Sequence, residues 1–146
     1  MQVLADSNIL VITANLSSPV YQETTNALVR LRRQGHRLVI LAQNLYEFWT
    51  VATRPIANNG LGLSTAQAQV ELQRLKSFFQ LLSDVPAIYA EWERLVIQHA
   101  VSGKNAHDAR IAAAMNVHGI TRLLTYNGRD FRRFAGITAI EPKQVK

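Results

Sequence analysis

The segment Arg37-Leu38-Val39-Ile40-Leu41 decides the fold class of this chain, because four apolar residues follow one another without a polar interruption. A strand that is apolar on both sides is typical of a parallel sheet covered by helices on both faces. Val3-Leu4-Ala5 and Arg122-Leu123-Leu124-Thr125 are shorter runs of the same kind, and helical patterns lie between them. This alternation predicts an α/β fold with a mainly parallel sheet.

Capping signals and breakers predict where the helices lie. We expect helices that begin at the cap signals Ser18-Pro19, Asn44, Ser64 with Gln67, Pro86 and Asn105. The corresponding stop signals are Gly35, Arg54-Pro55, Gly103 and Gly119. Phe79-Gln80-Leu81-Leu82 fits either a helix end or a strand, and Ile137-Thr138-Ala139-Ile140 predicts a last strand at the edge of the sheet.

The composition predicts a single folded domain over residues 1–146. Hydrophobic residues make up 48% of the 146 positions and charged residues 18%, which favours a packed core over disorder. There is no cysteine, so disulfides, cysteine-ligated metals and thiol nucleophiles are excluded. The sequence shows no targeting or membrane-spanning segment, so we expect a soluble, cytoplasmic protein. The net charge of +6 favours a polyanionic partner.

Four of the ten acidic residues stand out, and three of them fall where a parallel sheet forms its ligand site. Asp6 directly follows the first strand, Glu47 lies in the first turn after the predicted Asn44 cap, and Asp130 follows the strand that ends at Thr125. Such positions lie outside the carboxyl ends of strands. Asp108 joins them if the helix capped by Asn105 starts at the same edge. Each acid alone also fits a structural role, as an anion near a helix N-terminus or as a turn residue.

Together these carboxylates predict a site for a hard divalent cation. Clustered carboxylates repel one another, and an all-oxygen ligand set suits Mg²⁺ or Mn²⁺. Such cations activate water and stabilise phosphoryl displacement, which is nuclease chemistry. The basic residues that would hold a phosphate backbone are Arg30, Arg32, Arg33, Lys104, Arg110, Arg129, Arg132 and Arg133. The histidines lack zinc-site spacing.

The sequence resembles a PIN domain, and more narrowly a VapC-type toxin ribonuclease, over essentially its whole length. The resemblance rests on four short segments in order: ADSNILV from Ala5, NLYEF from Asn44, HDARIAA from His107 and LTYNGRDF from Leu124. It implies a three-layer α/β/α sandwich and a metal-dependent ribonuclease. Ser7 stands where relatives commonly have threonine.

The resemblance also implies roles for individual residues and partners. Asp6, Glu47 and Asp108 would ligate Mg²⁺ or Mn²⁺ and orient the attacking water. The fourth metal-site and catalytic residue would be Asp130, with Asn127 as the alternative in the same segment. Asn8 and Thr125 would support the site, as would Asn127 if it is not the ligand. Relatives often form homodimers and are inhibited by a small antitoxin, of the VapB type for this group, so the expected function is the toxin of a type II toxin–antitoxin pair that cleaves RNA.

Two other functions fit parts of the sequence. A catalytically inactive PIN-like module that binds RNA is supported only by Asn127, where some relatives have an acid. A phospho-acceptor signalling domain would place an acidic pair near Asp6, and no such pair is present. The expected function therefore remains an RNA hydrolase.

Overall fold

The computed structural model describes residues 1–146 and contains a five-stranded, fully parallel sheet. The strand order is β3-β2-β1-β4-β5, so the chain builds β1, β2 and β3 in one direction and then adds β4 and β5 on the other side of β1. This reversal creates a crevice at the carboxyl ends of β1 and β4, which is where α/β proteins bind ligands. The strands are β1 Gln2–Ala5, β2 Arg37–Leu41, β3 Gln80–Leu82, β4 Arg122–Leu124 and β5 Thr138–Ile140.

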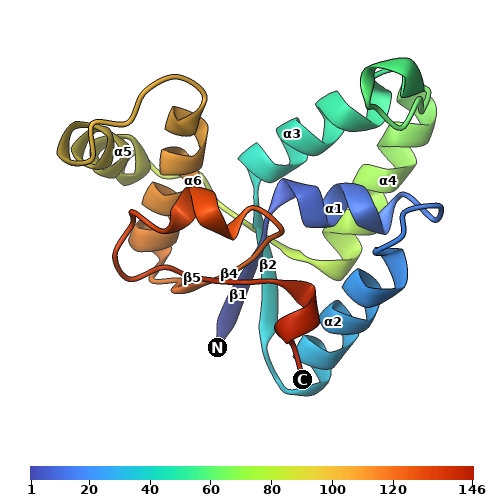
Figure 1. Ribbon diagram of the computed structural model, residues 1–146, viewed down its shortest axis with the longest axis horizontal. Helices are drawn as coiled ribbons and strands as arrows, with labels where there is room; N and C mark the ends of the chain where they lie inside the picture. The colour runs from blue at the N-terminus through green and yellow to red at the C-terminus, as the bar shows by residue number, and fades with distance from the viewer.

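Helices cover both faces of the sheet, which confirms the predicted three-layer α/β/α sandwich (Figure 1). On one side lie α1 Ser7–Thr13, α2 Tyr21–Arg33, α3 Ala42–Thr53 and α4 Thr65–Phe78. On the other side lie α5 Ala87–Gln98 and α6 Asn105–His118. Three short 3₁₀ turns complete the chain: η1 Ile56–Asn58, η2 Gly128–Phe131 and η3 Pro142–Gln144.

Alternation along the central strands divides the core into two halves. Val3 and Ala5 of β1 pack toward α1 to α4, whereas Leu4 between them packs toward α5 and α6. Successive side chains of a strand point to opposite faces of the sheet. Both faces are buried, which explains why the strand sequences are continuously apolar. The edge position of β5 and the strand at Gln80–Leu82 agree with the sequence patterns.

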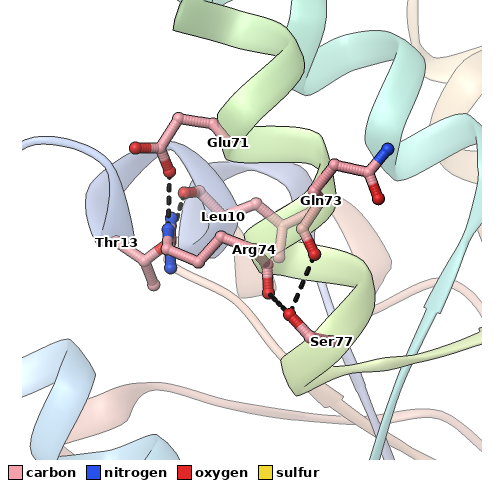
Figure 2. A network of polar contacts seen from close by, with 6 residues as sticks. All are labelled: Leu10, Thr13, Glu71, Gln73, Arg74 and Ser77. Carbon is pink, nitrogen blue, oxygen red and sulfur yellow. Dashed lines mark hydrogen bonds and ion pairs between the residues drawn. The ribbon is translucent and has the colours of Figure 1, made fainter.

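The helix α1 was not predicted from sequence. It begins immediately after Asp6, whose carboxylate Oδ1 accepts a hydrogen bond from the Ser7 backbone N–H at 2.8 Å and caps the helix. Its seven residues are rich in β-branched side chains, which lower helix propensity. Tertiary contacts hold it instead: Arg74 of α4 donates to the Thr13 hydroxyl at 3.0 Å while also pairing with Glu71 (Figure 2).

Three predicted helix starts are corrected by the structure. The helix expected from Ser18-Pro19 begins at Tyr21, and α3 begins at Ala42, so Asn44 lies inside its first turn. The Asn44 side chain still caps that helix, because its Oδ1 accepts from the Leu41 N–H at 2.8 Å. In α6, Asn105 is the first helical residue, and Lys104 precedes it without a side-chain cap. The Ser64–Gln67 capping box is confirmed.

None of the helices has the length and apolar character that crossing a lipid bilayer requires.

Candidate active site at the carboxyl ends of the central strands

Asp6 lies at the carboxyl end of β1 and is almost fully buried, with 5% of its surface exposed. Its Oδ2 accepts hydrogen bonds from the Thr125 hydroxyl at 2.8 Å and from the Asn8 side-chain amide at 3.2 Å. Burial raises the pKa of Asp6 above its ordinary value, and these hydrogen bonds oppose the rise. The side chain is therefore held in one orientation at the bottom of the crevice.

Thr125 and Asn8 link Asp6 to the segment after β4. The Asn8 amide also donates to Thr125 Oγ1 at 3.1 Å, and its Oδ1 accepts from the Tyr126 N–H at 3.1 Å. Thr125 Oγ1 accepts from the Asn127 N–H at 2.9 Å. The structure thus brings Asp6, Asn8, Thr125 and the backbone of Asn127 into one hydrogen-bonded network, although residue 8 and residue 125 are far apart in sequence.

Glu47 faces the same crevice from α3. Because α3 begins at Ala42, Glu47 lies in its second turn rather than in its first, and a simple interaction with the helix N-terminus does not explain it. Its Oε1 is buried without a hydrogen-bond partner. Burial raises the pKa of Glu47, and the negative charge of Asp6 raises it further, while the polar side chains of Ser7 and Gln43 oppose the rise.

Asp108 in the first turn of α6 completes the cluster. Burial raises its pKa to about 6, and the charges of Asp130, Asp6 and Glu47 contribute to that rise in this order. The hydrogen bond from the Gln43 side chain of α3 to the His107 carbonyl oxygen places the start of α6 beside α3, which itself begins directly after β2. The structure therefore brings the four predicted acids to the same edge of the sheet.

Asp130 and Asn127 come from the turn after β4 and from η2. Both residues are exposed. Asp130 is the largest electrostatic contributor to the raised pKa of Asp108, whereas Asn127 contacts the network through its backbone N–H. Of the two residues, only Asp130 therefore carries a charge that acts on Asp108.

The donor set fits a divalent cation. In the structure, no three His, Asp or Glu side chains lie close enough together to form a preassembled metal site. The carboxylates nevertheless repel one another, and the buried Glu47 Oε1 has no donor to satisfy it. A hard cation bound by oxygen ligands would relieve both problems, and Asp6, Glu47 and Asp108 offer only oxygen atoms.

Gln43 is a site residue that the sequence analysis missed. It is buried on α3, and its Nε2 donates to the His107 carbonyl oxygen at 2.9 Å, which ties α3 to the start of α6. Arg110 donates to Gln43 Oε1 at 3.1 Å and pairs with Asp84 at 3.3 Å. Part of its hydrogen-bonding capacity is therefore used within the fold. The spacing could have revealed Gln43, since a residue four positions before Glu47 shares its helix face.

The comparison with protein families gives a direct match. A model of the PIN domain matches residues 3–137, so the chain belongs to the PIN domain family. The resemblance stated from the four sequence segments is thereby confirmed. The comparison with curated proteins gives no match.

Solved structures of toxin–antitoxin proteins share the fold. VapBC2 from Rickettsia felis, bound to a DNA fragment from the promoter, has a TM-score of 0.71 at 18% identity and covers 97% of this chain and 98% of that chain. VapBC-1 from nontypeable Haemophilus influenzae has a TM-score of 0.70 at 16% identity, with the same coverage of 97% and 98%. VapC20 from Mycobacterium tuberculosis, described as a sarcin-ricin loop cleaving toxin, has a TM-score of 0.67 at 14% identity and covers 92% of this chain and 98% of that chain. At these identities the likeness establishes the fold.

Proposed function

We propose that this protein is a Mg²⁺- or Mn²⁺-dependent endoribonuclease that hydrolyses RNA phosphodiester bonds. The observation that carries the proposal is the buried Glu47 Oε1 without a hydrogen-bond donor, at the edge of the sheet where mutual repulsion of the carboxylates also raises the pKa of Asp108. A fold stabilised only by its core gains nothing from such repulsion. A nuclease gains from clustered carboxylates, because they bind the cation that its chemistry needs.

In this proposal, Asp6, Glu47 and Asp108 hold the cation, and Asp130 lies at the margin of the same space. A bound Mg²⁺ or Mn²⁺ supplies a water of lowered pKa and stabilises the negative charge that develops on the phosphate. The role of Thr125 and Asn8 is to fix the Asp6 carboxylate through the hydrogen bonds described above. Exposed arginines next to the site would bind the flanking phosphates.

We also propose that the chain is the toxin of a type II toxin–antitoxin pair. Structures that share its fold are toxin–antitoxin complexes, including VapBC from Salmonella typhimurium and FitAB bound to DNA. The expected partner is a small antitoxin of the VapB type, and the expected assembly is a homodimer acting on RNA in the cytoplasm. Expression of the chain alone should arrest growth, and coexpression of its antitoxin should restore it.

The direct experiment is RNA cleavage in Mn²⁺ by the wild type and by Asp6→Asn. Asparagine is also a good helix N-cap, so α1 should remain folded while one carboxylate charge is lost. The wild type should cleave RNA, EDTA should abolish cleavage, and Asp6→Asn should be inactive. Glu93→Gln is the matched control, because it removes an exposed carboxylate from α5 and should leave activity unchanged. Equal cleavage by wild type and Asp6→Asn would reject the proposal.

The inactive RNA-binding module is the alternative function. Its support is the exposed, uncharged Asn127 at the turn after β4. Such a module would bind RNA equally well in EDTA and in Mn²⁺ and would leave the RNA intact. Cleavage that depends on Asp6 therefore separates the two functions.

A further inference from the structure

Two adjoining hollows lie between Asp130 and the edge strand β5. The first, of about 340 Å³, is lined by Asn127 and Asp130 among others. The second, of about 390 Å³, reaches Ile137 and Lys143. The residues common to both are Gly128, Arg129, Arg132 and Glu141. Together the two hollows reach from Asp130 to η3, and we refer to them as the depression.

The depression carries cations that the fold does not neutralise. Arg129 and Arg132 are exposed, and neither takes part in any of the four ion pairs of the structure. Lys143 is paired with Glu141 at 3.2 Å, so one cation is already offset by the carboxylate that lines both hollows. Two unpaired guanidinium groups remain, and guanidinium groups match phosphate geometry closely.

Part of the lining of the second hollow is apolar, and we refer to this part as its floor. Phe131, Ile137 and Ala139 contribute to its lining. Gly128 lies against this floor: a Cβ at that position would lie 3.2 Å from the Ala139 Cβ, which is tighter than ordinary packing. The lack of a side chain at Gly128 therefore lets η2 lie close to β5. The volume is within the range of small-ligand pockets, about 300–1,000 Å³.

We propose that this depression binds the nucleotide next to the scissile phosphodiester, with Arg129 and Arg132 on its phosphates and its base against the apolar floor. This inference rests on the proposed function and specifies where the RNA lies. Single-stranded RNA is recognised by stacking of unpaired bases on side chains together with cationic contacts to the backbone. The depression offers the cationic contacts, and Ile137 and Ala139 give it an apolar surface against which a base can pack. Asp130 lines its first hollow. The RNA strand then crosses the β5 side of the sheet, away from β3.

The test measures RNA binding without cleavage. The probe is a short, labelled, single-stranded RNA of mixed sequence, titrated into Asp6→Asn protein in EDTA over a series of salt concentrations. The double substitution Arg129→Ala/Arg132→Ala should weaken binding and lower the slope of log affinity against log salt by about 1.4, because each phosphate contact on a single strand contributes about 0.7.

A charge-matched control separates a local contact from net charge. Arg37→Ala/Lys76→Ala removes two exposed cations that take part in no ion pair and lie near the amino-terminal ends of β2 and β3, and it should leave the salt slope nearly unchanged. Arg129→Lys/Arg132→Lys should retain most of the slope. The proposal would be overturned if the two alanine pairs lost RNA affinity equally. It would also be overturned if Arg129→Ala/Arg132→Ala bound RNA as tightly as the protein that keeps both arginines.

The same variants distinguish this inference from the proposed function. In Mn²⁺, with Asp6 intact, Arg129→Ala/Arg132→Ala should raise KM for RNA and leave kcat nearly unchanged. If Arg129→Ala/Arg132→Ala cleaved RNA with an unaltered KM, the RNA-binding role of the depression would be contradicted. The proposed nuclease function would not be affected by that result. If the wild type bound RNA through both arginines but did not cleave it, the RNA-binding role of the depression would be supported. The proposed nuclease function would be rejected. If Arg129→Ala/Arg132→Ala lost affinity for an acidic peptide but kept its affinity for RNA, the proposal would be overturned in favour of a protein partner.

Discussion

The Gln43 side chain bridges the two helices that carry Glu47 and Asp108. Its Nε2 donates to the His107 carbonyl oxygen at 2.9 Å, and His107 immediately precedes Asp108. Arg110 fixes the amide orientation by donating to the Gln43 Oε1 at 3.1 Å. One buried side chain therefore links the two helices that carry these carboxylates, which come from opposite layers of the sandwich.

We predict that Gln43→Leu lowers Mn²⁺ affinity and RNA cleavage about tenfold, the lower end of the effect expected when a residue that positions metal ligands is lost. The reason is that α3 and α6 lose their polar link near the site. Calorimetric Mn²⁺ titration and cleavage rates measure it. Gln73→Leu, on the exposed face of α4, is the matched control. Wild-type cation affinity in Gln43→Leu would show that the bridge only supports folding.

Thr125→Val should destabilise the protein by about 1–3 kcal/mol. The substitution preserves shape but removes the hydroxyl that donates to Asp6 and accepts from Asn8 and from the Asn127 backbone. Buried polar groups left without partners carry a penalty of this size. Thr125→Ser keeps the hydroxyl and should restore most of the loss. Urea unfolding measures both, and equal stability of the valine variant and the wild type would contradict the network.

Asp108→Asn should stabilise the cation-free protein at neutral pH. The pKa of Asp108 is raised from 3.8 to about 6 on folding, so the folded state binds more protons in that interval and loses stability as the pH rises through it. The gain should be about 1 kcal/mol, because Asp108 is only half buried and solvent screens its interactions. Chemical unfolding in EDTA measures it. The gain should shrink as the pH falls below about 6, and an asparagine variant less stable than wild type at neutral pH would contradict the repulsion.

The affinity for Mn²⁺ should fall as the pH decreases through about 6. Cation binding requires ionised carboxylates, and Asp108 takes up a proton in this range, well above the usual value for an aspartate. Titration of Mn²⁺ at a series of pH values measures the effect. An affinity that falls only near the ordinary carboxylate pKa of about 4 would mean that Asp108 does not share the site.

The parallel sheet and the positions of the acids along the chain were accessible from sequence because both follow from simple patterns. Continuous apolar runs such as Leu38–Leu41 mark strands buried on both faces, and Asp6 ends such a run. Parallel strands place their carboxyl ends at one edge, so the convergence of Asp6 with Asp130 could be predicted before any contact was known.

The contacts between layers were not accessible in this way. The helix α1 was missed because β-branched residues such as Ile9, Val11 and Ile12 weaken the helical signal. The true start of α3 depends on Asn44 capping backward onto Leu41. The Gln43 bridge joins residues on different helices, and only tertiary structure shows such a contact.

The central claim is that carboxylates far apart in sequence form one divalent-cation site. Calorimetric titration of Mn²⁺ into the cation-free chain at neutral pH tests this claim most directly. The account predicts saturable binding that is weakened separately by Asp6→Asn, Glu47→Gln and Asp108→Asn and is unchanged by Glu93→Gln. Absence of saturable binding, or binding that is equal in all of these variants, would contradict it.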